Sequence, residues 1–94
     1  MHIISRKALL GFAKTHAASE APIDAWYRVA KSASWASIDD VRKTYPHADF
    51  VSPYTVFNIK GNTYRLIVTI DYLYQRIYIK HVLTHAEYDK DAWK

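Results

Sequence analysis

The spacing of apolar residues changes about half-way along the chain. In the first half they recur three or four positions apart, which is the period of an amphipathic helix. Helices are therefore predicted over residues 6–19 and 22–33, with a short one after Ser37, whose hydroxyl group can cap it. The short helix ends before Pro46, and residues 47–53 are predicted to form a loop.

The second half alternates apolar and polar residues, as a half-buried strand does. Strands are predicted at residues 55–60, 63–72 and 76–83, after a short first strand at residues 2–5. Gly61-Asn62 indicates a tight hairpin turn, since glycine takes positive φ at no steric cost. A final helical segment is predicted between Ala86 and Trp93. The chain is thus predicted to form one α+β domain over residues 1–94, with helices packed on one face of an antiparallel sheet.

The alternation also predicts which side chains share a face of a strand. It places Arg65 on the side opposite Leu66. On the last strand it places Arg76 and Lys80 on one side and His81 on the other. Alternation does not set the register between strands, so it leaves open whether Arg65 and His81 lie on the same face.

Basic side chains are concentrated in the predicted sheet. The formal net charge is +4 and the sequence pI is about 9.4, which favours a polyanionic partner such as RNA, or an acidic protein. Within residues 54–85, Asp71 is the only acidic residue. The basic and histidine side chains of that stretch are Lys60, Arg65, Arg76, Lys80, His81 and His85.

Other chemistries find little support in the sequence. Without cysteine the chain has neither disulfides nor thiolate metal sites, and its histidines lack a tight metal-ligand spacing. We therefore expect no metal and no other cofactor. There is no run of about 18 apolar residues, and the start of the chain lacks the layout of a secretory signal. These observations predict a cytoplasmic protein that does not enter a membrane.

Two segments of the second half, FNIKGNTYR at residues 57–65 and THAEYD at residues 84–89, form a distinctive pair. In this order and this close to the C-terminus, they resemble the HigB family of toxins from bacterial type II toxin–antitoxin pairs. The resemblance extends back through the helical region of Trp26 and Trp35 to the first residues, so it covers most of the chain. It implies a RelE-like fold, in which N-terminal helices pack on a curved antiparallel sheet with a short C-terminal helix.

The resemblance also implies a function and its partners. The implied activity is that of a ribosome-dependent endoribonuclease, which cuts mRNA in the ribosomal A site without a metal ion. The implied partner is a HigA-like antitoxin with a helix-turn-helix domain, which neutralises the toxin. Contact with operator DNA is implied only through this antitoxin.

Metal-free RNA cleavage needs a base for the 2′-OH, a cation for the charge on the phosphate, and an acid for the departing 5′-oxygen. By the family pattern Arg65 is the candidate for the phosphate, since a guanidinium grips two oxygens at once. His85 is the candidate acid or base, because imidazoles in general titrate close to neutral pH. Tyr88 can stack on a base or pass a proton. Lys60 and His81 complete the predicted catalytic set.

Other basic residues are predicted to hold RNA rather than to react with it. They are Arg76 and Lys80 on the last strand, and Arg6 and Lys7 on the first helix. A plain structural role competes with several of these assignments. Lys60 can be an exposed turn lysine, His81 a packed strand residue, and the lysine and arginine of the first helix a solvated face.

Three other functions are open at this point. The leading alternative is a non-catalytic basic module that binds RNA or a protein through its sheet. A degenerate toxin, kept for its autorepressor complex, is the second. A metallonuclease is the third, and the absence of an acidic cluster in the strands disfavours it. Among the aromatic residues, Trp35 and Trp93 are candidates for exposed anchors under an antitoxin, and Trp26, Phe57, Tyr64 and Tyr78 are predicted in the core.

Overall fold

The computed structural model describes every residue from Met1 to Lys94. In order, the chain forms β1 (His2–Ile4), α1 (Arg6–Thr15), a 3-10 turn η1 (Ala17–Ser19), α2 (Glu20–Ser32), α3 (Ile38–Thr44), β2 (Asp49–Val51), β3 (Tyr54–Ile59), β4 (Tyr64–Asp71), β5 (Arg76–Thr84) and α4 (His85–Asp89). The predicted order of elements is confirmed, except that the predicted loop at residues 47–53 contains strand β2. With three residues, this strand is too short to show an alternation.

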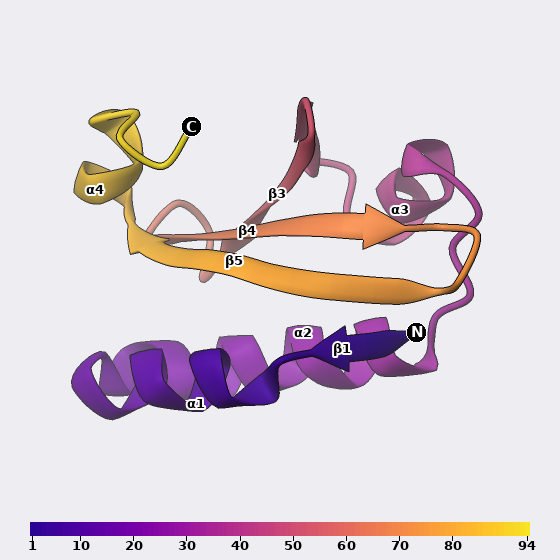
Figure 1. Ribbon diagram of the computed structural model, residues 1–94. Helices are drawn as coiled ribbons and strands as arrows, with labels where there is room; N and C mark the ends of the chain where they lie inside the picture. The colour runs from indigo at the N-terminus through magenta and orange to yellow at the C-terminus, as the bar shows by residue number, and fades with distance from the viewer.

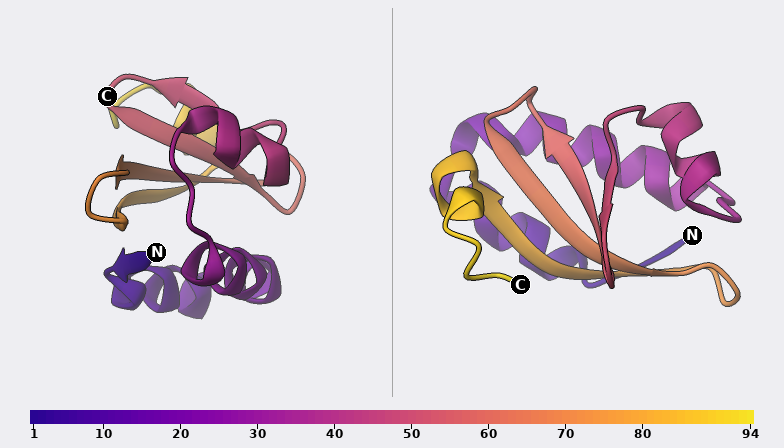
Figure 2. Two further views of the ribbon diagram at one scale, coloured as in Figure 1. Left: turned by 90° about the vertical axis from the view of Figure 1, so that its right-hand side faces the viewer. Right: turned by 90° about the horizontal axis from the view of Figure 1, so that it is seen from above.

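The strands form one sheet in the order β1-β5-β4-β3-β2. The neighbours from β5 to β2 run antiparallel, whereas β1 runs parallel to β5 at the edge. Figure 1 shows α1 and α2 beneath β4 and β5, and Figure 2 shows β3 turning away from this helical layer. The α+β class is confirmed, and the expected antiparallel sheet is corrected in its β1–β5 pair. None of the helices has both the length and the apolar character needed to cross a membrane.

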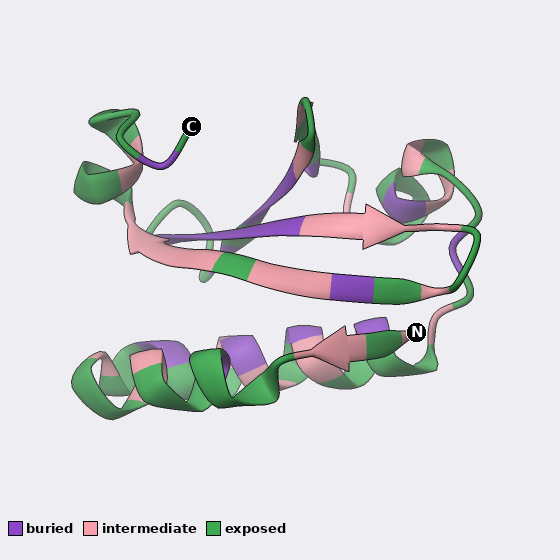
Figure 3. Ribbon diagram, in the orientation of Figure 1, coloured by how far each residue is buried: buried purple, intermediate pink, exposed green.

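The main core lies between the sheet and α1, α2 and α3. Trp26 and Phe57 are each 1% exposed, and their rings meet edge to face with centroids 5.3 Å apart. Figure 3 shows buried positions along β3 and β4 and on the turns of α2 nearest the sheet. Of the aromatic residues predicted in the core, Trp26, Phe57 and Tyr64 are buried and Tyr78 is half-buried. The apolar burial that stabilises the fold is therefore concentrated on this face of the sheet.

A bulge in β5 interrupts the pairing between β4 and β5. Ile67 pairs with His81, but the neighbouring pair is Val68 with Ile79, so Lys80 is the extra residue. An extra residue reverses the direction of every side chain that follows it along the strand.

The bulge places His81 and Arg65 on the same face of the sheet. His81 pairs with Ile67, which lies two residues beyond Arg65, and residues paired directly across strands point to the same side. Arg76 pairs with Asp71, which also shares this parity, so Arg76 lies on this face too. The prediction that Arg76 and His81 lie on opposite faces is therefore wrong, because strict alternation does not foresee a bulge.

Two tryptophans that were candidates for exposed positions are buried. Trp35 is 5% exposed and stacks on Phe57 in the main core. Trp93 is 6% exposed and covers Val56 and Ile67 on the opposite face of the sheet. Both indoles are thus used inside the chain, and neither is an exposed anchor for a partner.

Candidate active site

The hairpin between β3 and β4 sets the position of Arg65, the second residue of β4. The Thr63 N–H donates to the Lys60 carbonyl at 3.2 Å, which closes the turn around Gly61 and Asn62. Gly61 has a φ of 62°, in the left-handed region that glycine reaches most easily. The predicted tight turn is confirmed, and it ends directly before the strand that carries the arginine.

The Arg65 side chain folds back onto this turn. Its Nη1 donates to the carbonyl oxygens of Asn62 at 3.2 Å and Tyr64 at 3.3 Å, and its Nη2 donates to Asn62 Oδ1 at 2.8 Å. Arg65 is 8% exposed, and none of the ion pairs in the structure includes it. A guanidinium has about five N–H donors, so Nε–H and one Nη2–H remain without a partner. A held cation with unused donors and no carboxylate is suited to an anion such as a phosphodiester.

Helix α4 begins where β5 ends, next to the same turn. Thr84 caps it: the Glu87 N–H donates to Thr84 Oγ1 at 3.2 Å, and the Thr84 N–H donates to Glu87 Oε1 at 2.9 Å. This reciprocal pair is a capping box. The His85 N–H donates to the Thr63 carbonyl at 3.0 Å, which ties the start of α4 to the turn beside Arg65.

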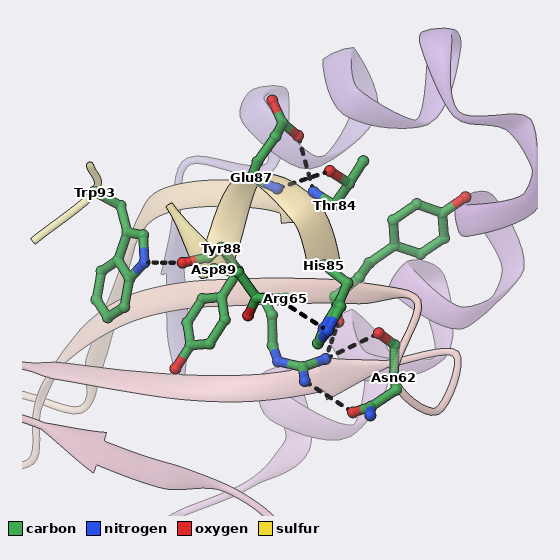
Figure 4. A network of polar contacts seen from close by, with 9 residues as sticks. Asn62, Arg65, Thr84, His85, Glu87, Tyr88, Asp89 and Trp93 are labelled. Carbon is green, nitrogen blue, oxygen red and sulfur yellow. Dashed lines mark hydrogen bonds and ion pairs between the residues drawn. The ribbon is translucent and has the colours of Figure 1, made fainter. Parts of the chain in front are cut away.

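His85 and Asp89 form a polar contact along α4. His85 Nε2 lies 3.1 Å from Asp89 Oδ2, and 49% of the His85 side chain is exposed. Because Nε2 contacts Asp89, Nδ1 is the ring nitrogen left for another partner. Figure 4 shows the imidazole directed towards the turn that carries Asn62, on the side of α4 where the Arg65 guanidinium lies. A large ligand bound at Arg65 can therefore reach the imidazole.

Tyr88 lies next to Arg65 on the side away from Asn62. Its half-buried ring has its centroid 5.2 Å from Arg65 Cζ, which is a cation–π contact. The structure thus brings Arg65, His85 and Tyr88 together at one end of the sheet. Sequence reasoning missed the two residues that orient them, Asn62 and Asp89. A signal for Asp89 is its position four residues after His85, which directly precedes the predicted helical segment. No sequence pattern marks the role of Asn62.

Lys60 and His81 lie near this group in different surroundings. Lys60 is exposed in the turn, where its φ is 53°. His81 is half-buried on the Arg65 face of the sheet. The hollow that it lines is also formed by Leu83, Glu87, Lys90, Ala92 and Trp93. Histidine, aspartate and glutamate side chains do not come together in groups that could hold a metal ion.

The predicted RNA-binding residues of β5 are exposed, and each lies beside an aromatic ring. Arg76 Cζ is 5.4 Å from the centroid of the Tyr74 ring, and Lys80 Nζ is 5.7 Å from that of Tyr78. Cations that alternate with aromatic rings suit a single-stranded nucleic acid, whose phosphates and bases can engage both.

Arg6 and Lys7 belong to α1 on the helical side of the sheet, away from the Arg65 face. Arg6 lies 3.7 Å from Asp24 and stacks over the Tyr27 ring at 4.5 Å, whereas Lys7 is exposed. The structure therefore does not bring these two residues to the Arg65 group.

The capping box makes the stability of α4 dependent on pH. The pKa of Glu87 is lowered below its ordinary value of 4.5, chiefly by the hydrogen bond from the Thr84 N–H and to a smaller extent by that from the Thr84 hydroxyl group. A carboxyl whose pKa is lowered by folding stabilises the folded state above that ordinary value, and the contribution is lost as the pH falls through the folded pKa. We expect α4 to fray below about pH 4.5, as seen by faster amide hydrogen exchange at Tyr88.

A Glu87→Gln variant is the matched control, because the amide oxygen can accept the same hydrogen bonds without titrating. It should keep α4 at neutral pH and lose the acid dependence of exchange. Equal acid dependence in the variant and the natural chain would place its origin elsewhere.

Residues 19–91 match the HigB_toxin family, described as the RelE-like toxic component of a toxin-antitoxin system. The chain belongs to the HigB toxin family. The HigB resemblance and the RelE-like α+β fold expected from it are thereby confirmed, and this HigB chain is one component of a toxin–antitoxin pair.

Named relatives are similar to this HigB chain over nearly their whole length. One, from Escherichia coli O6:H1 (strain CFT073), is named mRNA interferase HigB; it is 30% identical over 96% of this chain and 90% of its own. Another, from Escherichia coli (strain K12), is named mRNA interferase toxin HigB; it is 27% identical over 95% of this chain and 88% of its own. A Shigella flexneri protein named mRNA interferase HigB matches to the same extent.

Proposed function

We propose that this chain is an endoribonuclease toxin that cleaves mRNA on the translating ribosome. The names of its relatives support an RNA-cleaving activity. The observation that carries the proposal in this chain is Arg65, held by Asn62 with unused donors beside His85 and Tyr88. The family implies an antitoxin partner. We assign this role to a HigA-like protein with a helix-turn-helix domain, which alone contacts operator DNA, and we place the pair in the cytoplasm.

Arg65 supplies the positive charge for the transition state. The 2′-oxygen attacks phosphorus, so that a P–O2′ bond forms while the P–O5′ bond breaks. The products are a 2′,3′-cyclic phosphate and a free 5′-hydroxyl group. Negative charge grows on the non-bridging oxygens, where the two unused donors of Arg65 can meet it. Because the bonds to Asn62 already orient the guanidinium, little reorganisation is needed during the reaction.

His85 supplies proton transfer. One proton leaves the 2′-OH and one reaches the 5′-oxygen, and His85 Nδ1 serves one of these transfers while Asp89 holds the ring through Nε2. Tyr88 packs against Arg65 and is placed to stack on a nucleobase of the RNA or to pass a proton. His81, on the Arg65 face, is the candidate for the second transfer. Lys60, at the rim of the turn, is placed to neutralise a neighbouring phosphate.

Placement of the mRNA is the part that we assign to the ribosome. A substrate held in a reactive geometry can account for much of a rate enhancement without a further catalytic group. Arg76 and Lys80 then hold the strand along β5, and Arg6 and Lys7 contact ribosomal RNA. Contacts of this kind weaken as salt concentration rises.

Expression of this chain without its antitoxin tests the proposal. Growth is expected to stop, and mapping of RNA ends is expected to find new 5′-hydroxyl ends inside translated reading frames. The same cuts should appear in a purified translation system only when ribosomes are present. A His85→Ala variant should cleave at least about 100-fold more slowly than the natural chain, since general acid–base groups contribute about 10²- to 10⁴-fold.

Each contrary outcome points to a different alternative. Growth arrest without new RNA ends would favour a non-catalytic module that binds RNA or protein. No arrest, together with a tight antitoxin complex, would favour a degenerate toxin kept for repression. Cleavage that needs no ribosome would remove the ribosome from the proposal and leave the nuclease.

A further inference from the structure

The segment after α4 folds back onto the Arg65 face of the sheet. Trp93 is 6% exposed and packs on Val56 and Ile67. Its indole N–H donates to the Tyr88 carbonyl at 3.0 Å, and its ring meets that of Tyr54 edge to face with centroids 5.7 Å apart. The indole is therefore fixed from several sides.

Trp93 stacks on the ring that contacts the candidate catalytic arginine. The Trp93 and Tyr88 rings are 5.1 Å apart between centroids and only 14° from parallel. Arg65 Cζ lies 5.2 Å from the centroid of the same Tyr88 ring. Figure 4 shows Trp93 and Arg65 on opposite sides of Tyr88, so the three side chains form a layered stack. We call Trp93, Tyr88 and Arg65 the stack.

Trp93 supplies the stacked contact of the Tyr88 ring on the side away from Arg65. Helix α4 has five residues, none of them buried, and helices this short are marginal without packing. The hydrogen bonds of Arg65 within the chain all go to Asn62 and Tyr64, at the hairpin turn. The Tyr88 ring is the contact that flanks the guanidinium away from that turn.

We propose that Trp93 is a positioning residue for RNA cleavage, which orders the Arg65 guanidinium through the ring of Tyr88. This inference rests on the proposed function, in which Arg65 meets the phosphate. Trp93 acts through Tyr88 rather than on the RNA, because its indole N–H already donates to the Tyr88 carbonyl and its ring packs against those of Tyr88 and Tyr54. Trp93 affects how accurately the Arg65 guanidinium is positioned. A small misplacement of a catalytic group lowers the rate of the chemical step more than it weakens the binding of substrate.

The experiment compares two substitutions that separate stacking from apolar cover. Trp93→Phe keeps an aromatic ring against Tyr88 and loses the indole N–H. Trp93→Leu keeps an apolar side chain over Val56 and Ile67 and has no ring to stack. Trp35→Leu is the matched control, because Trp35 is 5% exposed in the main core on the other face of the sheet.

Two readouts are measured on the folded fraction of each variant. Ribosome-dependent cleavage gives kcat and KM, and the NMR signal of the Arg65 Nε–H gives its chemical shift and its exchange with solvent. We expect Trp93→Leu to lower kcat about 10- to 100-fold with KM nearly unchanged. It should also shift the Nε–H signal and speed its exchange. Trp93→Phe should retain most of the kcat, and Trp35→Leu should change neither readout.

Equal kcat and equal Nε–H signals in the Leu and Phe variants would overturn the inference, because Trp93 would then act only as apolar cover. A loss in KM alone would also overturn it. Should Arg65→Ala cleave as fast as the natural chain, the proposed role of Arg65 fails instead. In that case the Nε–H signal still decides whether the stack orders the guanidinium. If Trp93→Leu does not fold, Tyr88→Leu removes the same stack, and an Arg65 Nε–H signal with unchanged solvent exchange in that variant would overturn the inference.

Discussion

An Arg65→Ala variant is expected to cleave mRNA about 10²- to 10³-fold more slowly than the natural chain, which is the usual effect of removing one preorganised donor group. The reason is that Arg65 is the buried cation beside His85 and Tyr88, and its hydrogen bonds to Asn62 fix the orientation of the guanidinium. Its two unused N–H donors have no substitute on the same turn except the exposed Lys60. Single-turnover cleavage on programmed ribosomes measures the loss directly.

Two further variants test whether the loss of cleavage comes from losing the guanidinium of Arg65 or from a general disturbance of the fold. Arg65→Lys keeps the charge and loses the fork of donors, so we expect it to recover only a small part of the rate. Arg42→Ala is the control, because Arg42 also donates to a main-chain carbonyl, that of Ala48 at 3.0 Å, but lies on α3. It should cleave normally. Full activity of folded Arg65→Ala would remove Arg65 from the mechanism.

A Trp26→Ala variant is expected to lower the free energy of unfolding by about 3–5 kcal/mol, the usual cost of truncating a buried large aromatic side chain. Trp26 is 1% exposed, and its ring packs edge to face on Phe57, so the substitution leaves a cavity between α2 and the sheet. The total free energy of unfolding of a small domain is about 5–15 kcal/mol. Much of its stability would therefore be lost, as urea denaturation can measure.

Residues on the same helix provide the comparison. Val29 is 39% exposed on α2, and Val29→Ala should change the stability by no more than about 0.5 kcal/mol. Trp26→Phe should cost less than Trp26→Ala, because it keeps an aromatic ring and removes an indole N–H that is buried without a partner. A loss for Val29→Ala as large as that for Trp26→Ala would mean that packing at the main core is not the cause.

The sequence by itself determined the elements that local periodicity and capping specify. The predicted helix of α2, the cap at Ser37 and the turn at Gly61 all agree with the structure, since each depends on residues close together in the chain. A helical segment after the last strand was also predicted, and the structure places α4 there, capped by Thr84. These local signals, with the family resemblance, also marked Arg65, His85 and Tyr88 as the residues to examine.

The tertiary structure alone decided which of these side chains meet. The bulge at Lys80 puts His81 on the face of Arg65, and a bulge follows from how two strands pair rather than from either strand's own pattern. Trp93 is buried because the chain after α4 returns to the sheet, which no periodicity of a few residues can reveal. The grip of Asn62 on Arg65 depends on a side chain folding back onto its own turn. Contacts between distant or reversed segments are set by the packing of the whole chain, and local patterns carry no information about them.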